Sequence, residues 1–281
     1  MGFREKLEKA QEKNRSLLCI GLDPQPELMP VKDVAGFGRA IIEATSDLVS
    51  AYKPNLAFYE ALGLEGLRAL EKTLSFIPPS IPVIGDAKRG DVGHSALAYA
   101  RALFEVWGFD AATVNPYLGY DSLEPFLEYK ERGVFLLART SNPGAGDFQE
   151  LSFQGVPLYQ QVALKAREWN RYGNIGLVAG ATFPEGLRKL RQLCPDMLLL
   201  IPGIGAQGGH LGRAVACGLD GGGKGAIFAT SRGVLYASRG GDFAQRARDK
   251  AEGIRAEIER GRQATEGPEK GQATPWGGLL S

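Results

Sequence analysis

Cysteine is scarce in this 281-residue sequence, and long apolar runs are missing. Cys19, Cys194 and Cys217 are odd in number and widely spaced, which fits neither a disulfide framework nor a metal-binding knuckle. We therefore expect three reduced, buried thiols in a cytoplasmic protein. No apolar run reaches the roughly 18 residues that a membrane span needs. The first residues, Met1–Arg15, lack the apolar stretch of a signal peptide.

The sequence also lacks an excess of charge of either sign. It contains 33 Lys and Arg against 32 Asp and Glu, which gives a formal net charge of +1. This balance argues against dedicated binding to nucleic acid or to a membrane surface, so we expect neither partner. The 44% hydrophobic and 23% charged content is typical of globular proteins, and the length suits a single α/β barrel of about 250 residues.

Short apolar runs alternate with longer amphipathic stretches, which indicates repeated βα units and a parallel sheet. Eight runs are expected to be strands: Leu17–Gly21, Tyr52–Pro54, Val83–Asp86, Ala111–Val114, Val134–Ala138, Ile175–Ala179, Met197–Ile201 and Ala226–Ala229. Two of the stretches between them, His94–Trp107 and Leu158–Trp169, have apolar residues at helical spacing. We expect these apolar faces to be core: Leu97, Ala100, Phe104 and Trp107 in the first, and Leu158, Val162, Ala166 and Trp169 in the second.

Polar residues at or just after the strands favour a closed barrel over an open doubly wound sheet. In a barrel the carboxyl ends of all strands share one rim, whereas an open sheet would leave several of these residues far apart. The residues are Asp23, Lys53, Asp86, Lys88, Asn115, Ser141, Gln207 and Arg232. We predict a single-domain (β/α)8 TIM barrel over residues 1–261 with an N-terminal helix. The Gly- and Pro-containing residues 262–281 are expected to form a flexible tail, which Trp276 could anchor.

The charged run Asp86–Asp91 follows the third predicted strand. Asp86 and Lys88 are two residues apart, so at a strand end they project to the same side, and Lys53 offers a second ammonium from the neighbouring strand. Carboxylates nearby would keep Lys88 protonated. A protonated lysine in a barrel mouth can stabilise negative charge on carbon and then deliver a proton. The alternative is a surface turn with solvated charges.

A second motif, Gly203–Gly208, matches the pattern G-x-G-x-x-G of dinucleotide-binding proteins. It falls late in the chain, whereas that fingerprint normally opens a nucleotide-binding domain, so glycines that allow a tight turn are an equal alternative. In a barrel, the loops after the seventh and eighth strands frequently hold phosphate. Gln207 and Arg232 lie on those loops, Arg232 can grip phosphate in bidentate fashion, and Gly233 lets the backbone come close. A surface ion pair is the alternative for Arg232.

Together these segments resemble the orotidine 5′-phosphate decarboxylase family. The resemblance covers about residues 17–240, and the set is specific although each piece is short. The matching segments, in order, are Gly21–Pro24, Lys53–Asn55, the D-x-K-x-x-D of Asp86–Asp91, Thr113–Pro116, Thr140–Pro143, Pro202–Gly209 and Ser231–Gly233.

The resemblance implies decarboxylation of orotidine 5′-phosphate to UMP in pyrimidine biosynthesis, without a cofactor or a metal ion. By this resemblance, Lys88 is the proton donor to C6 of the pyrimidine, and Asp86 and Lys53 complete a charged network. Asp91 would reach into the active site of the other subunit of a homodimer. Ser95 stands where the family usually has threonine, and it keeps the hydroxyl for a ribose contact across the same interface.

The remaining substrate contacts are also implied by the resemblance. Asp23 and Lys53 would contact the ribose, Ser141 the pyrimidine ring, and Gln207 and Arg232 the 5′-phosphate. Taken singly, Asp23 and Ser141 are more often turn or cap residues. No role is carried over to His94, which we expect to be structural.

Three other functions remain open at this stage. Metal-dependent sugar-phosphate decarboxylases and aldolases resemble the same family and share D-x-K-x-x-D. A Schiff-base aldolase is disfavoured, because flanking carboxylates keep Lys88 protonated whereas a nucleophilic amine needs a lowered pKa. A non-catalytic phosphosugar-binding barrel would keep Gln207 and Arg232 without needing Lys88.

Overall fold

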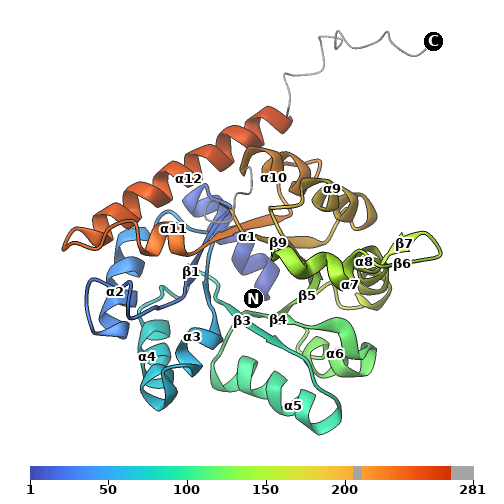
Figure 1. The fold of residues 1–281 in the computed structure, drawn as a ribbon, viewed down its shortest axis with the longest axis horizontal. Helices are drawn as coiled ribbons and strands as arrows, with labels where there is room; N and C mark the ends of the chain where they lie inside the picture. The colour runs from blue at the N-terminus through green and yellow to red at the C-terminus, as the bar shows by residue number, and fades with distance from the viewer. Residues whose placement is uncertain (205–210, 267–281) are drawn as a thin grey trace.

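The computed structural model describes residues 1–204 and 211–266, and it shows a closed barrel of parallel strands (Figure 1). The sheet order is β2-β1-β10-β9-β8-β5-β4-β3, and the bridges Tyr52–Val83 and Asn55–Asp86 join its two edges. The strands are β1 (Leu18–Leu22), β2 (Ala51–Pro54), β3 (Ile84–Arg89), β4 (Ala111–Val114), β5 (Gly133–Arg139), β8 (Ile175–Ala179), β9 (Leu198–Pro202) and β10 (Ala226–Thr230). All eight predicted strands are present, and the predicted TIM barrel is confirmed.

Helices surround the barrel, because its strands are apolar on both faces and must be covered on the outside. The helices of this ring are α2 (Val34–Thr45), α4 (Gly63–Ser75), α5 (Gly93–Arg101), α6 (Tyr120–Leu127), α8 (Leu158–Trp169), α9 (Pro184–Leu193), α10 (Leu211–Gly218) and α12 (Phe243–Glu266). A π-helix, η1 (Ala102–Val106), continues α5. Shorter elements lie in the loops: helices α3 (Leu56–Glu60), α7 (Gly146–Gln149) and α11 (Arg232–Leu235), 3-10 turns η2 (Pro116–Leu118) and η3 (Pro143–Ala145), and the hairpin β6 (Ser152–Phe153) with β7 (Val156–Pro157).

The N-terminal helix, α1 (Phe3–Asn14), closes the amino-terminal end of the barrel. Phe3 and Leu7 are buried against inward-facing strand residues such as Phe135, whose ring meets that of Phe3 edge-on at 5.7 Å. A Cβ at Gly133 would lie 2.4 Å from the Phe3 ring, so glycine is required there for the helix to dock. Helix α1 therefore covers the amino-terminal end of the barrel.

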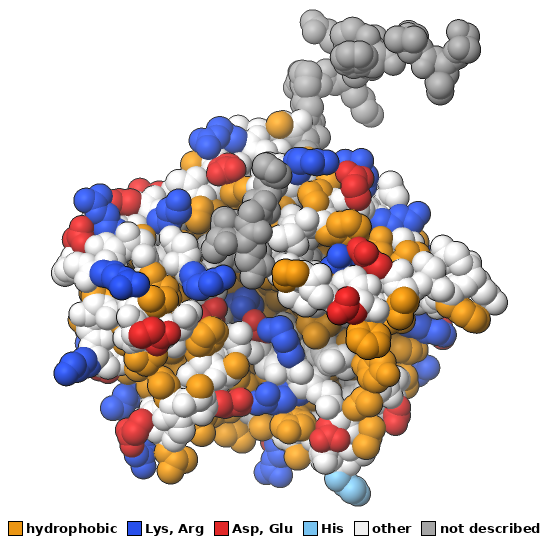
Figure 2. All heavy atoms as spheres, viewed as in Figure 1, with side chains coloured by type: hydrophobic (Ala, Val, Ile, Leu, Met, Phe, Trp, Pro, Cys, Tyr) orange, Lys and Arg blue, Asp and Glu red, His pale blue; other side chains and the backbone are white. Residues whose placement is uncertain are grey.

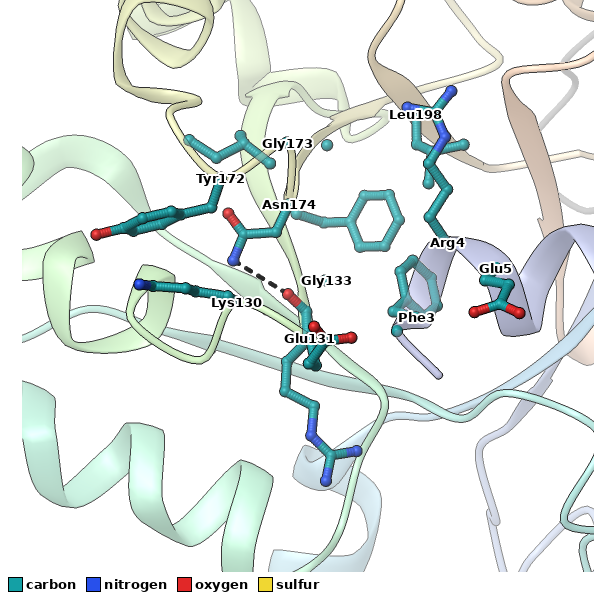
Figure 3. Close-up of a pocket in the computed structure, with 15 residues that line it drawn as sticks. Phe3, Arg4, Glu5, Lys130, Glu131, Gly133, Tyr172, Gly173, Asn174 and Leu198 are labelled. Atoms are coloured by element: carbon teal, nitrogen blue, oxygen red, sulfur yellow. Dashed lines mark hydrogen bonds between the residues drawn. The ribbon is translucent and has the colours of Figure 1, made fainter.

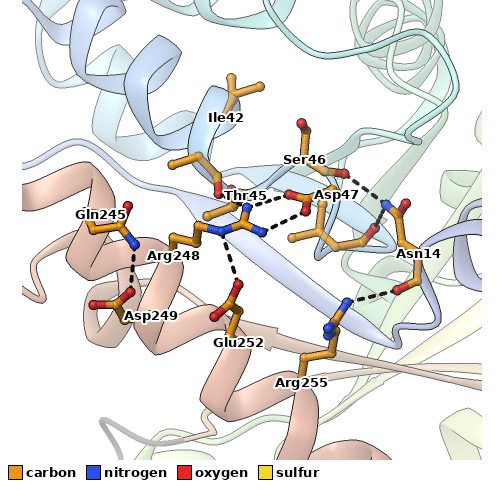
Figure 4. Close-up of polar contacts among 12 residues, drawn as sticks. Asn14, Ile42, Thr45, Ser46, Asp47, Gln245, Arg248, Asp249, Glu252 and Arg255 are labelled. Atoms are coloured by element: carbon orange, nitrogen blue, oxygen red, sulfur yellow. Dashed lines mark hydrogen bonds and ion pairs between the residues drawn. The ribbon is translucent and has the colours of Figure 1, made fainter.

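The last helix ties the two ends of the chain together. Arg248 on α12 makes a bidentate ion pair with Asp47, at 2.7 and 2.9 Å, and Arg255 donates to the carbonyl of Asn14 at 3.3 Å (Figure 4). Helix α12 continues through Glu266, so the expected boundary at residue 262 falls inside this helix. Trp276 lies outside the described residues. Among the residues that the structure describes, no helix combines the length and apolar character needed to cross a membrane.

The predicted helical faces are only partly correct. Ala100 and Phe104 are buried, but Leu97 is 52% exposed, because the buried face of α5 is formed by Ala96 and Ala100, which are one helical turn apart. Leu158 at the first turn of α8 is likewise exposed. All three cysteines are buried, as expected.

Candidate active site

A cavity of about 350 Å³ opens at the carboxyl ends of the strands. Figure 2 shows it as the hollow at the centre of the barrel face, with charged side chains of both signs inside. Five residues predicted from the sequence line it: Asp23, Lys53, Asp86, Ser141 and Arg232. They come from the ends of β1, β2, β3, β5 and β10, which only a closed barrel brings to one place.

Asp86 is the centre of the charged cluster. Its Oδ2 accepts a hydrogen bond from Lys53 Nζ at 2.7 Å, and its Oδ1 accepts one from Lys88 Nζ at 2.6 Å. The side chains of Lys53 and Asp86 are only 7% and 8% exposed, whereas that of Lys88 is 47% exposed. Lys53 and Asp86 therefore form a buried ion pair. The half-exposed Lys88 ammonium is hydrogen-bonded to this pair, although Lys88 is not one of the residues that line the cavity.

Electrostatics keep this buried pair ionised. Burial disfavours the charged form of Asp86, but Lys53 and Lys88 outweigh that effect and hold the pKa of its carboxyl well below the usual range. Burial also disfavours the Lys53 ammonium, yet Asp86 and Asp23 raise its pKa above the ordinary value. Beneath them, burial raises the pKa of the Cys19 thiol to about 12, so Cys19 is a neutral thiol at physiological pH.

The backbone of β3 is irregular where it carries these charges. Gly85 pairs with Ala112 of β4 and Arg89 with Val114, so three residues of β3 face the single residue Thr113. Lys88 within this bulge has φ = +47°, a left-handed conformation that non-glycine residues rarely adopt. Bulges of this kind re-aim side chains next to active sites.

Thr113 occupies the gap that the bulge leaves. Its Oγ1 donates to Asp86 Oδ1 at 2.9 Å and accepts from the backbone N–H of Lys88 at 3.0 Å. Thr113 lies in the segment Thr113–Pro116 that resembles the family, and no role was predicted for it. A buried threonine in a strand fits ordinary strand composition, so no signal in the sequence distinguishes it.

Asp23 is held beside the cluster by neighbours that the sequence analysis also missed. Ser231 Oγ donates to Asp23 Oδ2 at 2.5 Å, and the N–H of Asn55 donates to Oδ1 at 3.3 Å. A Cβ at Gly21 would lie 1.9 Å from Ser231 Oγ, so glycine is needed there for this contact. The segments Gly21–Pro24 and Ser231–Gly233, which are far apart in the sequence, therefore lie in contact beside the cluster.

The loop that carries Ser141 is held by hydrogen bonds to the preceding residue, Thr140. Gln149 on α7 accepts from the N–H of Thr140 and donates to its Oγ1, both at 2.8 Å. Arg139 donates to the carbonyl of Thr140 at 2.8 Å. These contacts fix the loop on which Ser141 reaches the cavity.

Arg232 is exposed at the start of α11 and lines the cavity. Its guanidinium makes no hydrogen bond or ion pair with any residue in the described ranges, so it is available to a ligand. Gly233 lies next to it in α11 but does not line the cavity. Gln207 lies outside the described residues.

Asp91 and Ser95 are not brought into the cavity of their own chain. Asp91 follows the end of β3 and its Oδ1 accepts from the N–H of Val92, while Ser95 is exposed on α5. His94 is exposed beside Ser95. Within the described part of this chain, the cluster therefore consists of Lys53, Asp86 and Lys88.

A second cavity, of about 300 Å³, lies at the opposite end of the barrel beside α1 (Figure 3). Its polar groups are already engaged: Asn174 Nδ2 donates to the carbonyl of Arg132 at 3.2 Å, and Lys130 stacks over the Tyr172 ring at 4.5 Å. None of the predicted site residues lines it. Features at this end of such barrels serve stability rather than chemistry.

Comparison with known proteins identifies the family of this chain. The model of the "Orotidine 5′-phosphate decarboxylase / HUMPS family" matches residues 16–246. The chain is 54% identical to the orotidine 5′-phosphate decarboxylase of Thermomicrobium roseum over 276 residues, covering 95% of this chain and 98% of that protein. It is 51% identical to the enzyme of the same name from Cellvibrio japonicus, covering 93% and 100%.

Solved structures show the same fold. The structure of Leishmania donovani OMP decarboxylase superposes with a TM-score of 0.84 at 38% identity, covering 94% of this chain and 99% of that chain. These three matches each cover more than 90% of both proteins, and the range of the family model, residues 16–246, contains the cavity-lining residues named above. This chain belongs to the orotidine 5′-phosphate decarboxylase family.

Proposed function

We propose that this protein decarboxylates orotidine 5′-phosphate to UMP, without a cofactor, in the cytoplasmic synthesis of pyrimidine nucleotides. The observation that carries the proposal is the buried Asp86 carboxylate between two ammonium groups, in a cavity that Arg232 also lines without a hydrogen bond or ion pair to any described residue. This arrangement suits a substrate that has an anionic phosphate at one end and develops negative charge on carbon at the other. The named relatives support the same activity.

The reaction needs one proton and no redox partner. The bond between C6 and the carboxylate breaks, CO2 leaves, and the electron pair stays on C6 as a carbanion. The Lys88 ammonium stabilises this charge and then transfers a proton to C6, which gives UMP. The neutral Lys88 amine regains a proton from water after the product leaves.

Substrate binding is distributed around the rim. Arg232, with Gln207, would hold the 5′-phosphate, Asp23 and Lys53 the ribose, and Ser141 the pyrimidine. Binding energy at the phosphate is remote from the bond that breaks, so it can hold the substrate carboxylate against the charged cluster. Fixed orientation of this kind lowers the barrier without any further chemistry.

We further propose that the active unit is a homodimer in which Asp91 and Ser95 complete the partner's site. Neither residue lines the cavity of its own chain, although Asp91 is only three residues after Lys88 in the sequence. Apolar side chains are exposed on the same side of the barrel, after β3 and β4: Val92 is 51%, Tyr117 82% and Leu118 45% exposed. An exposed apolar set next to polar residues is typical of an interaction surface.

Mixing two inactive variants tests whether Asp91 of one subunit completes the active site of the other. Lys88→Ala and Asp91→Ala subunits, unfolded and refolded together, should regain about one quarter of wild-type activity, because half the dimers are mixed and each has one intact site. Each variant refolded alone is the control and should stay inactive. If mixing restores no activity while mixed dimers form, Asp91 acts within its own subunit.

The nearest alternative is a metal-dependent sugar-phosphate decarboxylase or aldolase. The two carboxylates of the cavity are already engaged, Asp86 by two ammonium groups and Asp23 by Ser231. A divalent cation would have to approach Asp86 against both lysines, which opposes binding. Ser141 and Arg232 line the same cavity and favour a nucleotide substrate. Ser141 could hydrogen-bond to the edge of the ring, and Arg232 could bind the phosphate.

One assay separates the candidate functions. We expect protein treated with a chelator and then desalted to convert orotidine 5′-phosphate to UMP at the untreated rate, followed by loss of absorbance of the substrate. Activity that disappears with chelator and returns with Mg²⁺ would favour the sugar-phosphate enzymes. Binding of UMP without any turnover would favour a phosphosugar-binding barrel.

A further inference from the structure

Because of the bulge in β3, the backbone N–H of Lys88, the proposed proton donor, has no backbone acceptor on β4. Between the pairs Gly85–Ala112 and Arg89–Val114, the residues of β3 have no regular ladder partner on β4. The N–H of Lys88 lies in this stretch and points towards β4, where a buried donor needs an acceptor. Lys88 also has φ = +47°, which a non-glycine residue keeps only when its surroundings hold it there.

The Thr113 hydroxyl meets both requirements at once. It accepts from the Lys88 N–H at 3.0 Å and donates to Asp86 Oδ1 at 2.9 Å, and Thr113 is only 1% exposed. The same Oδ1 accepts from Lys88 Nζ at 2.6 Å. One hydroxyl group therefore holds the backbone of the lysine and the carboxylate that anchors its ammonium.

Thr113 is only 1% exposed and does not line the cavity, so its side chain cannot reach a bound nucleotide. Its effect must pass through Asp86 and Lys88. A hydroxyl is needed in this position, because one group has to accept from an N–H and donate to a carboxylate. Valine has nearly the same shape and can do neither, whereas serine can do both.

We propose that Thr113 is a positioning residue for the decarboxylation: it fixes the left-handed backbone of Lys88 and the Asp86 carboxylate so that the ammonium faces the reacting carbon. This inference rests on the proposed role of Lys88. It predicts that loss of the Thr113 hydroxyl slows the chemical step and leaves substrate binding almost unchanged. Misplacement of a reacting group by about 1 Å can cost about 100-fold in rate.

The test compares Thr113→Val with Thr113→Ser. We expect Thr113→Val to lower kcat by about 10- to 100-fold, while KM for orotidine 5′-phosphate and the affinity for UMP stay within about twofold. Thr113→Ser should keep kcat within about threefold of wild type, because the hydroxyl remains. Should Thr113→Val fail to fold, Thr113→Ala against Thr113→Ser gives the same comparison.

Thr73→Val is the matched control for the loss of a buried threonine hydroxyl. Thr73 is fully buried on α4, remote from the cavity, and donates to the Ala69 carbonyl. This variant should lose thermal stability without losing kcat. The inference fails if Thr113→Val keeps wild-type kcat, or if Thr113→Ser and Thr113→Val lose kcat equally. An inactive wild-type protein would instead overturn the proposed function itself.

Discussion

Replacement of Lys88 by alanine is expected to lower kcat by about 10⁴-fold or more, because it removes both the charge that stabilises the carbanion and the group that protonates it. Both effects come from the same ammonium group, so alanine removes them together. Conversion of orotidine 5′-phosphate to UMP, followed with enough protein to detect slow turnover, measures the loss. The affinity for UMP should change far less than kcat, since Arg232 and Asp23 remain.

The fold should survive this change. Lys88 is 47% exposed, and in its absence Asp86 still accepts from Lys53 and Thr113. Circular dichroism and the melting temperature of Lys88→Ala should therefore stay close to those of wild type. Lys130→Ala, at the opposite cavity, is the control for loss of a lysine and should keep full activity. A Lys88→Ala protein that retains more than a few per cent of kcat would refute the assigned role.

Replacement of Asp86 by asparagine should affect both activity and stability. The buried Lys53 ammonium loses its carboxylate partner, and breaking a buried ion pair of this kind costs about 3–5 kcal/mol. The Lys88 ammonium loses its anchor as well, so we expect kcat to fall by at least about 100-fold. Urea unfolding and steady-state kinetics measure the two effects separately.

A second substitution identifies the cause of the instability. In Asp86→Asn combined with Lys53→Met, the unpaired buried charge is gone, so much of the lost stability should return. Activity should not return, because neither Asp86 nor Lys53 is restored. If the double variant is no more stable than Asp86→Asn, the loss does not come from the unpaired ammonium.

The pH dependence of stability gives an independent check on Asp86. Its pKa is lowered in the folded state, so the carboxylate contributes stability above its unfolded pKa of about 3.9, and this contribution is lost as the pH falls towards the folded pKa. Asp86→Asn lacks the contribution at every pH. The stability difference between wild type and Asp86→Asn should therefore be constant near neutral pH and should narrow below about pH 4.

The barrel could be predicted from the sequence because its strands are recognisable as short apolar runs between amphipathic stretches. The charged residues then fall at strand ends, and a closed sheet brings Lys53, Asp86 and Lys88 together whatever the details of the loops. Ser141 and Arg232 follow from the same argument. Local order in the sequence was sufficient for these residues.

Features that depend on a change of register could not be predicted. The bulge in β3 and the π-helix after Arg101 both alter the phase of side chains, and neither leaves a mark in composition. The left-handed conformation of Lys88 and the role proposed for Thr113 both follow from the bulge. The role proposed for Asp91 illustrates a different limit, because the sequence of one chain does not give the position of a second subunit.

Exchange of the C6 hydrogen of UMP in D2O tests the central claim most directly. In this exchange the C6 proton is removed to give the carbanion, and the carbanion then accepts a deuteron. We predict that the wild-type protein introduces deuterium at C6 of bound UMP, detected by proton NMR. Lys88→Ala should bind UMP and introduce none above the background rate. Exchange at the wild-type rate in Lys88→Ala would contradict the account, since another group would then have to form and protonate the carbanion.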